Sequence, residues 1–223
     1  MPPVNPEEIA GLLRPFAVLD STQLAATATY LDLLLKWNAK INLTAVRAPK
    51  EIVTRHFGES FFAAGKLLSS ASAISVIDLG SGAGFPGLPL AIFAPSASVT
   101  LMEANAKKAA FLNEVVSALK LRNVTVARQR GESYSGSAEL VTMRAVEAFA
   151  TALPVAAALV RSGGRLALMI GASQVSAAKA ATPEFVWDLE IAIPASHSRV
   201  LLVGTKKVTV GEDNDLGPGS GVR

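Results

Sequence analysis

The first third of the chain has the hydrophobic spacing of helices. A capping residue at Asn5 predicts a helix that ends near Phe16. A longer helix is expected from Ser21, and a third from near Pro49. The pattern predicts a helical N-terminal extension, residues 1–70, that packs on the rest of the protein. The second predicted helix carries its apolar residues on one face, at Leu24, Ala28, Leu31 and Leu35.

From residue 74 onward, short apolar segments with the length of strands alternate with helical segments. This alternation predicts an α/β fold with a Rossmann-like, doubly wound, mostly parallel sheet over residues 71–207. Gly163 and Gly164 are expected to stop a helix, and the glycine-rich, polar residues 208–223 are expected to form a flexible tail. The expected strands are 73–79, 97–103, 123–128, 138–145 and 164–171, with an antiparallel edge from 185–193 and 198–206, and the expected helices are 86–93, 106–120 and 147–160.

The first predicted strand runs into a glycine-rich turn and then a helix, VIDLGSGAGFPG, residues 76–87. Gly80, Gly82 and Gly84 remove Cβ atoms where the backbone must turn sharply and approach a ligand. Pro86 suits the first turn of the following helix because it lacks an N–H there. Ligands of open α/β sheets bind at this edge, so the turn predicts a nucleotide-cofactor pocket.

Two acidic residues narrow the choice of cofactor. Asp78 lies two residues before the first glycine, and Glu103 ends the next strand about twenty residues downstream, where a carboxylate can accept both ribose hydroxyls. This arrangement resembles class I S-adenosylmethionine (SAM) methyltransferases. The spacing Gly82-x-Gly84-x-x-Gly87 also satisfies the dinucleotide-binding pattern. A nicotinamide-dependent oxidoreductase therefore stays an alternative, although no histidine or Tyr-x-x-x-Lys pair is placed for hydride transfer.

Composition excludes several kinds of site. The 223 residues contain no cysteine, which excludes disulfides, thiolate metal ligands and a cysteine nucleophile, and the two histidines are too far apart for a metal cluster. The N-terminus lacks the basic and apolar regions of a signal peptide, and the longest mostly apolar run is too short to span a bilayer. The sequence therefore predicts a soluble cytoplasmic protein without a metal site.

A run of basic residues predicts a surface for phosphates. The formal net charge is +3, and positive residues gather between positions 107 and 130 against Glu114 alone. Such a run can neutralise RNA phosphates, although a solvated helix and strand surface is the alternative. The predicted RNA-binding residues are Lys107, Lys108, Lys120, Arg122, Arg128 and Arg130, with Arg199 near the last strand as a further candidate.

Four segments occur in a characteristic order and spacing: LLLKWNAKINLTAVRAPKEIVTRHF, VIDLGSGAGFPGLPLAIFAP, FLNEVV and VTMRAV. Together they resemble the RsmG (GidB) family of small-subunit ribosomal RNA guanine-N7 methyltransferases, over residues 30–171. Ordinary class I methyltransferases do not share the WN-x-x-x-NLT block. The resemblance implies a monomeric cytoplasmic enzyme that uses SAM to methylate N7 of a guanine in the 530 loop of 16S ribosomal RNA. Its implied partner is 16S ribosomal RNA or the small ribosomal subunit.

The residues present also bear on which base can be methylated. Guanine N7 carries an in-plane lone pair and no hydrogen, so in-line attack on the SAM methyl group needs positioning but no general base. Cytosine C5 methylation normally uses a cysteine nucleophile, which this chain lacks. Methylation of exocyclic amines usually needs an Asn/Asp-Pro-Pro-aromatic loop where this chain has TMRA, residues 142–145. Arg144 is therefore expected to position the substrate, by donating to guanine O6 or to an RNA phosphate.

The family pattern also implies SAM contacts after the glycines, after the third strand and after the fourth strand. Each has a structural alternative: Phe85 can be a core residue, Glu132 a loop charge, and Arg144 a partner of Glu147 one helical turn on. The predicted cofactor site consists of Asp78, Gly80, Gly82, Gly84, Phe85, Glu103, Gly131, Glu132 and Arg144.

The block before the glycine turn has two interpretations. Asn42 and Thr44 are expected to satisfy turn backbone groups and to dock the extension on the SAM domain. Arg47, Arg55 and His56 could instead face RNA. A lone histidine is more often a packing residue than a catalyst, and the proposed chemistry requires no proton shuttle.

One departure from the family pattern motivates a second function. Ile170 stands where the family usually has a lysine, which removes a cation from the site or from the RNA-facing surface. A noncatalytic RNA-binding or ribosome-assembly protein with the same fold is therefore a further alternative. Glu103 also replaces the commoner aspartate, a change that the chemistry of ribose binding tolerates.

Overall fold

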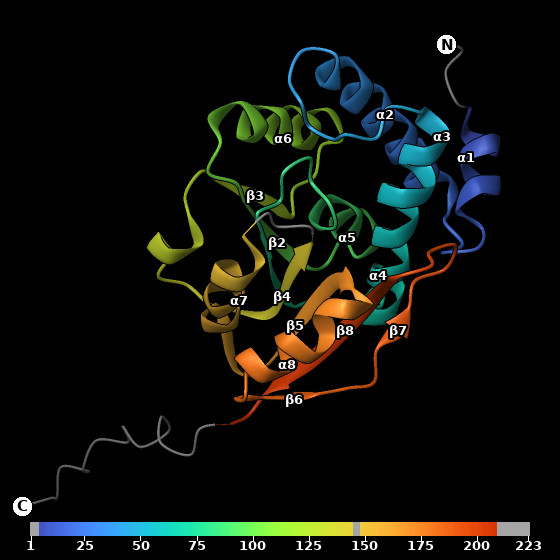
Figure 1. Ribbon diagram of the computed structural model, residues 1–223. Coiled ribbons are helices and arrows are strands. Elements are labelled where there is room, and N and C mark those ends of the chain that lie inside the picture. Colours follow the sequence, from blue (N-terminus) through green and yellow to red (C-terminus); the bar gives the residue numbers. More distant parts are fainter. Residues whose placement is uncertain (1–4, 145–147, 209–223) are drawn as a thin grey trace, which may run out of the picture.

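A β-sheet forms the centre of the structure, a computed structural model that describes residues 5–144 and 148–208 (Figure 1). Within these residues the sheet has the order β3-β2-β1-β4-β5-β8-β6, with β7 paired to β8. β1 to β5 run parallel and β8 runs antiparallel to β5, which confirms the predicted doubly wound, mostly parallel sheet. The strands are β1 (Ser75–Leu79), β2 (Ser98–Met102), β3 (Val124–Ala127), β4 (Ala138–Arg144), β5 (Val160–Gly171), β6 (Phe185–Trp187), β7 (Ile191–Ala192) and β8 (Arg199–Lys206).

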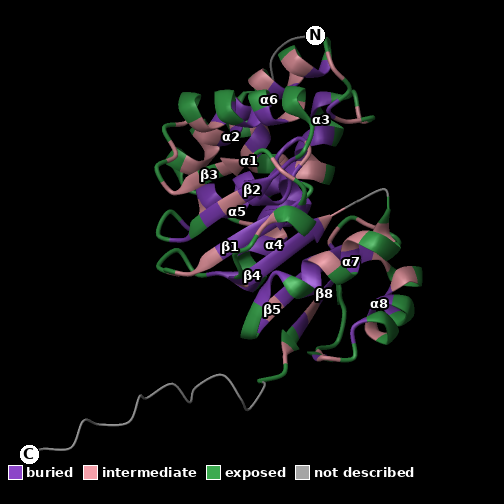
Figure 2. Ribbon diagram, turned by 90° about the vertical axis from the view of Figure 1, so that its left-hand side faces the viewer, coloured by how far each residue is buried: buried purple, intermediate pink, exposed green. Residues whose placement is uncertain are grey.

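Helices cover both faces of the sheet (Figures 1 and 2). α5 (Gly87–Phe93) and α6 (Ala106–Ala118) share one hydrophobic cluster with the N-terminal helices, and α7 (Phe149–Ala158) and α8 (Val175–Ala181) share another. Neighbouring residues of one strand fall in opposite clusters, Val76 in the first and Ile77 in the second. This alternation is expected for a strand that is buried on both faces.

The N-terminal residues form helices, as predicted. The side chain of Asn5 caps α1 (Pro6–Leu13) by accepting the N–H of Glu8, and Asp20 caps α2 (Ser21–Asn38). α3 (Pro49–Ile52) continues through a π-helical turn (Val53–Gly58) into α4 (Glu59–Leu67). Residues from α1, α2 and α4 join the same core cluster as α5, so the extension packs directly on the sheet domain.

Gly163 and Gly164, which were expected to stop a helix, lie in a strand. α7 ends at Ala158, and Gly163 and Gly164 lie inside β5, so that prediction is wrong. Gly163 has a φ of 71°. Ala138 of β4 pairs with Val160 and Leu140 pairs with Arg165, so the residues between Val160 and Arg165 bulge out of the ladder. Glycine is the residue that such a bulge accommodates.

The C-terminal half differs from the predicted pattern in two further ways. Residues 185–193 form the short strands β6 and β7 instead of one strand, and the alanine-rich α8 was not predicted.

α5 begins one residue after Pro86, which occupies its N-cap. The predicted flexible tail falls almost entirely on residues 209–223, which lie outside the described residues. Within the described part of the chain, no helix combines the length and apolar character that crossing a bilayer requires.

Candidate active site

Asp78 anchors the glycine-rich turn to the sheet. Its fully buried carboxylate accepts hydrogen bonds from the Thr142 hydroxyl on β4 (2.8 Å) and from the Gly87 N–H at the start of α5 (3.1 Å). A Cβ at Gly87 would lie 2.7 Å from Asp78 Oδ2, so this position requires glycine. Burial raises the pKa of Asp78 to about 6, against the lowering effect of its hydrogen bonds. Asp78 is not among the residues that line the cavities described below, and its contact with the cofactor stays a prediction.

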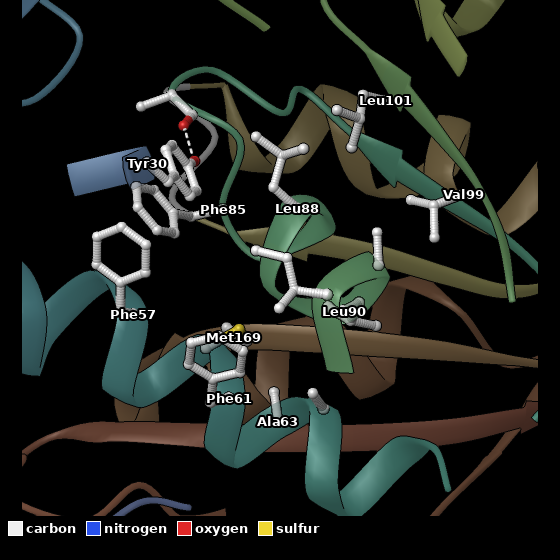
Figure 3. Close-up of a cluster of buried hydrophobic side chains, with 14 of the residues drawn as sticks. Tyr30, Phe57, Phe61, Ala63, Phe85, Leu88, Leu90, Val99, Leu101 and Met169 are labelled. Atoms are coloured by element: carbon white, nitrogen blue, oxygen red, sulfur yellow. Dashed lines mark hydrogen bonds between the residues drawn. The ribbon is translucent and has the colours of Figure 1, made fainter. Parts of the chain in front are cut away.

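The glycines of the turn divide into two roles. Gly80, Gly82 and Gly84 have φ angles of 70°, 57° and 92°, which residues with a Cβ rarely adopt. A Cβ at Gly84 would lie 2.5 Å from the Tyr30 hydroxyl, which donates to the carbonyl of Ala83 (Figure 3). Gly84 therefore allows α2 to pack against the turn, whereas Gly80 and Gly82 line a cavity.

Phe85 belongs to both the core and the site. Its ring is stacked on Tyr30, with centroids 5.3 Å apart, and on His56, with centroids 5.1 Å apart. Phe57 meets the same ring edge-on at 5.0 Å (Figure 3). Phe85 is buried and still lines the larger cavity, so the core interpretation and the cofactor interpretation are compatible.

Two adjoining cavities lie beside the glycine turn. The larger, about 980 Å³, has the turn on one side and residues 42–45, Arg47 and His56 of the extension on the other. The smaller, about 200 Å³, has apolar walls that suit a purine ring. The two cavities share Gly80, Glu103, Ala104 and Arg130, and the smaller is also lined by Leu79, Met102, Gln129, Gly131, Glu132, Ala152 and Val155.

Glu103 stands where the two cavities meet. One carboxylate oxygen accepts the N–H of Gly82 (2.9 Å) and the other accepts the N–H of Asn105 (2.8 Å). These bonds fix the carboxylate at the end of β2, and each oxygen keeps a further lone pair for a donor. The geometry fits a carboxylate that holds ribose hydroxyls between an adenine in the smaller cavity and a methionine chain beside the glycine turn.

Gly131 and Glu132 border the smaller cavity, as the cofactor prediction requires. A Cβ at Gly131 would lie 2.7 Å from side-chain atoms of both Leu79 and Val155, so a larger residue would displace two side chains that line this cavity. Glu132 is exposed at the same rim. Glu147, the alternative partner for Arg144, lies outside the described residues.

The helical extension holds the Arg144 guanidinium at the end of β4. Nη1 donates to the His56 carbonyl and to the Ser60 hydroxyl, both at 3.3 Å. Nη2 donates to the Arg55 carbonyl at 2.7 Å and to His56 Nδ1 at 3.1 Å, and it pairs with Glu59 at 3.2 Å. Burial lowers the pKa of Arg144, and Glu59 counteracts this effect. Arg144 lines the larger cavity, but the described residues already occupy its four Nη hydrogens.

His56 is a buried imidazole with both nitrogens engaged. Nδ1 faces Arg144, and Nε2 lies 2.7 Å from the Thr44 hydroxyl. Burial, together with the positive charges of Arg144, Arg55 and Arg199, lowers the pKa of His56 to about 3. The imidazole is therefore neutral near pH 7 and is not poised as a general base, which agrees with a packing role.

Residues 38–47 form a tight turn at the cavity wall. Asn38 Oδ1 accepts the N–H groups of Leu43 (2.9 Å) and Thr44 (3.0 Å). Arg47 donates to the carbonyl of Asn38 (3.0 Å) and to Asn42 Oδ1 (2.9 Å). Thr44 accepts the backbone N–H of Val46 (3.1 Å), as predicted. The prediction for Asn42 is wrong, because its side chain accepts from the Arg47 guanidinium and Asn38 satisfies the turn backbone instead. Several side chains of the turn line the larger cavity.

Comparison with known proteins identifies the group to which this site belongs. The GidB family, described as rRNA small subunit methyltransferase G, matches residues 23–198. The chain belongs to this family. The Ribosomal RNA small subunit methyltransferase G of Xanthomonas axonopodis pv. citri is 43% identical over 155 residues, 69% of this chain and 71% of the relative. That of Xylella fastidiosa is 42% identical over 173 residues, 76% of this chain and 80% of the relative.

A solved methyltransferase structure shares the fold of this GidB family member. The ribosomal protein L11 methylase of Lactobacillus delbrueckii subsp. bulgaricus superposes with a TM-score of 0.58 at 14% identity, over 69% of this chain and 79% of that chain. This likeness confirms the predicted class I methyltransferase fold. Membership of a methyltransferase family confirms SAM as the cofactor and leaves the nicotinamide alternative without support.

The basic run of this family member is divided between two edges of the sheet. Lys107 and Lys108 open α6 and Arg128 and Arg130 follow β3, so these four lie at the carboxyl edge, where Lys108 and Arg130 line the larger cavity. Lys120 and Arg122 lie between the end of α6 and the start of β3, at the opposite edge. The sequence alone did not separate these two groups.

Glu59 is a site residue that sequence analysis missed. It is 2% exposed and accepts from Arg199 Nε at 2.9 Å and Nη2 at 2.5 Å, besides pairing with Arg144. Arg199 is therefore engaged in an ion pair, and its predicted contact with RNA stays a prediction. Ile170, where the GidB family usually has a lysine, is 5% exposed and belongs to the core cluster shared with α7 and α8.

Proposed function

We propose that this protein transfers the methyl group of SAM to N7 of a guanine in the 530 loop of 16S ribosomal RNA. The names of its relatives support a small-subunit ribosomal RNA as the substrate. The observation that carries the proposal is the larger cavity, where the glycine turn and Glu103 stand opposite residues 42–45, Arg47 and His56. Cofactor and base can therefore meet in one cleft, lined by the segment that ordinary class I methyltransferases lack.

The groups that line this cleft suit a reaction without a general base. Bound SAM supplies a methyl group activated by its sulfonium, and guanine N7 offers a lone pair that carries no proton. His56 is neutral with both nitrogens bonded, and the Glu103 oxygens accept backbone N–H groups. The residues of the cleft therefore act by positioning the reactants and by excluding water.

The rim of the cleft suits an RNA substrate. Lys108 and Arg130 line the larger cavity, and Lys107 and Arg128 lie close to it in sequence at the same sheet edge. Cations at this edge can neutralise the phosphates that flank a base bound in the cleft. One chain lines both cavities, which fits a monomeric enzyme, and a ribosomal RNA substrate requires a cytoplasmic one.

Transfer of a labelled methyl group tests the proposal. The purified protein is incubated with methyl-labelled SAM and total ribosomal RNA or subunits from cells that lack this protein. Label is expected in 16S ribosomal RNA and absent from 23S ribosomal RNA. Binding of SAM and of RNA without label in either RNA would contradict the proposal and favour the noncatalytic alternative.

A further inference from the structure

Thr44 lies in the wall of the larger cavity, and its hydroxyl is held by two hydrogen bonds. Thr44 lines the larger cavity but not the smaller, and it comes from the turn of residues 38–47 that faces the glycine turn. Its oxygen lies 2.7 Å from His56 Nε2 and 3.1 Å from the N–H of Val46. The direction of each of these hydrogen bonds decides what the hydroxyl can still do.

The direction of the bond to His56 follows from Arg144. A guanidinium only donates, so His56 Nδ1, 3.1 Å from Arg144 Nη2, must be the acceptor. A neutral imidazole that accepts at Nδ1 carries its proton on Nε2. The lowered pKa of His56, about 3, supports the neutral form. His56 Nε2–H therefore donates to the Thr44 oxygen.

Both lone pairs of the Thr44 oxygen are thus in use. One accepts the His56 N–H and the other accepts the backbone N–H of Val46. The hydroxyl proton remains to be donated, and none of the described residues supplies an acceptor for it. The hydrogen bonds that link Arg144 to His56 and His56 to Thr44 therefore leave one oriented donor, the Thr44 hydroxyl, at the wall of the cleft.

A donor of this kind complements the fully engaged Arg144. The four Nη hydrogens of Arg144 point at groups of the extension, so its bidentate donation to a base would require those bonds to break. The Thr44 proton can be donated without any rearrangement. A guanine that keeps N7 free for methylation presents the adjacent O6 as an acceptor, whereas adenine presents an amino group there.

We infer that the Thr44 hydroxyl is a specificity-determining group that donates to O6 of the target guanine, an inference that rests on the proposed function. Thr44 thereby favours guanine over adenine, because the amino group of adenine is a donor and would face the Thr44 hydroxyl, which is also a donor. Arg144 acts on this contact through His56, by fixing the tautomer that turns the Thr44 proton toward the cleft.

The test compares three variants of the full chain on 16S ribosomal RNA and on SAM binding. Thr44→Val keeps the shape and removes the donor, and Thr44→Ser keeps the donor. Thr54→Val is the matched control, because the Thr54 hydroxyl bonds only to carbonyls of its own helical turn and does not line the cavities. Loss of one hydrogen bond to substrate is expected to lower kcat/KM for RNA about tenfold or more in Thr44→Val, with Thr44→Ser and Thr54→Val close to wild type.

The affinity for SAM separates the substrate from the cofactor as the acceptor. An unchanged SAM dissociation constant together with the loss in kcat/KM for RNA supports the inference. Weakened SAM binding that accounts for the whole loss, or an unchanged kcat/KM, would overturn it. If wild-type protein itself transfers no methyl group to RNA, the proposed function fails, and the inference fails with it.

Thr44→Val leaves the N–H groups of His56 and Val46 without their acceptor. If this variant does not fold, a second substitution tests the inference. Thr44→Cys keeps a similar volume, but its thiol is a weak donor and a weak acceptor. The variant is expected to lose kcat/KM for RNA as Thr44→Val does. Wild-type kcat/KM in a folded cysteine variant would contradict the inference.

Discussion

Glu59 and Arg144 form a buried ion pair between the helical extension and the end of β4. Arg144 Nη2 lies 3.2 Å from Glu59 Oε2, and the two side chains are 11% and 2% exposed. Glu59 also holds Arg199 at the start of β8. One carboxylate of α4 therefore ties two strand ends to the extension, next to the cleft that Arg144 lines.

Removal of the Glu59 charge is expected to destabilise the protein. Glu59→Gln leaves Arg144 without its counterion in a buried place, which typically costs about 3–5 kcal/mol. For a chain of this size, the loss corresponds to a fall of about 10 °C in melting temperature. Thermal denaturation followed by circular dichroism measures it.

Glu51→Gln is the matched control, because the Glu51–Arg55 pair is about half exposed. Its loss is expected to cost no more than about 1 kcal/mol. Equal melting temperatures for the two variants would show that the Glu59 pairs do not hold the extension to the sheet.

Glu103→Gln is expected to weaken SAM binding about tenfold or more, because charge-assisted hydrogen bonds to the ribose are lost. One amide N–H group of the variant would also face a backbone donor, either Gly82 or Asn105. Isothermal titration calorimetry with SAM measures the dissociation constant. Glu114→Gln on α6, away from both cavities, should bind SAM like wild type, and similar affinities in the two variants would refute the ribose contact.

The division of the basic run predicts two different salt dependences of RNA binding. Replacing Arg128 and Arg130 with glutamine removes two cations at the carboxyl edge. The slope of log K against log salt should then decrease in magnitude by about 1.4–1.8. The same change at Lys120 and Arg122, at the opposite edge, should leave the slope unchanged. Equal effects of the two pairs would remove the carboxyl edge as the RNA-binding face.

The pH dependence of methyl transfer tests the absence of a general base. The pKa of His56 is about 3, below its unfolded value, so the imidazole stays neutral as pH falls through 6.5. Its contribution to stability is present above about pH 6.5 and is lost as pH falls toward about 3. Because the pKa of Asp78 is about 6, we expect kcat/KM to show no inflection between about pH 7 and pH 8, and an inflection in that range would assign a titrating group to the reaction.

The sequence was sufficient for the features that depend on local chemistry. The glycine turn, the carboxylate at the end of β2 and the strand–helix alternation each follow from residues close together in the chain. The prediction of a helix end at Gly163 and Gly164 was wrong because glycine is favoured in strand bulges as well as at helix ends. Whether these glycines form a bulge depends on the pairing of β5 with β4. That pairing is a tertiary property.

The contacts around Arg144 could not be predicted for a related reason. Arg144 bonds to His56, 88 positions away, and Glu59 bonds to Arg199, 140 positions away. No local pattern marks Glu59 as buried, since a glutamate in the middle of a helix normally lies on its solvated face. Sequence analysis therefore identified Arg144 and missed the group that holds it.

The position of the methyl group on the RNA distinguishes guanine N7 from other target atoms. Ribosomal RNA from cells lacking this protein is methylated by the purified enzyme with SAM and then treated with aniline under conditions that cleave at 7-methylguanosine. Cleavage is expected at one guanine in the 530 loop of 16S ribosomal RNA, and none is expected without the enzyme. Methyl incorporation without cleavage there would contradict the N7 chemistry and the assigned target.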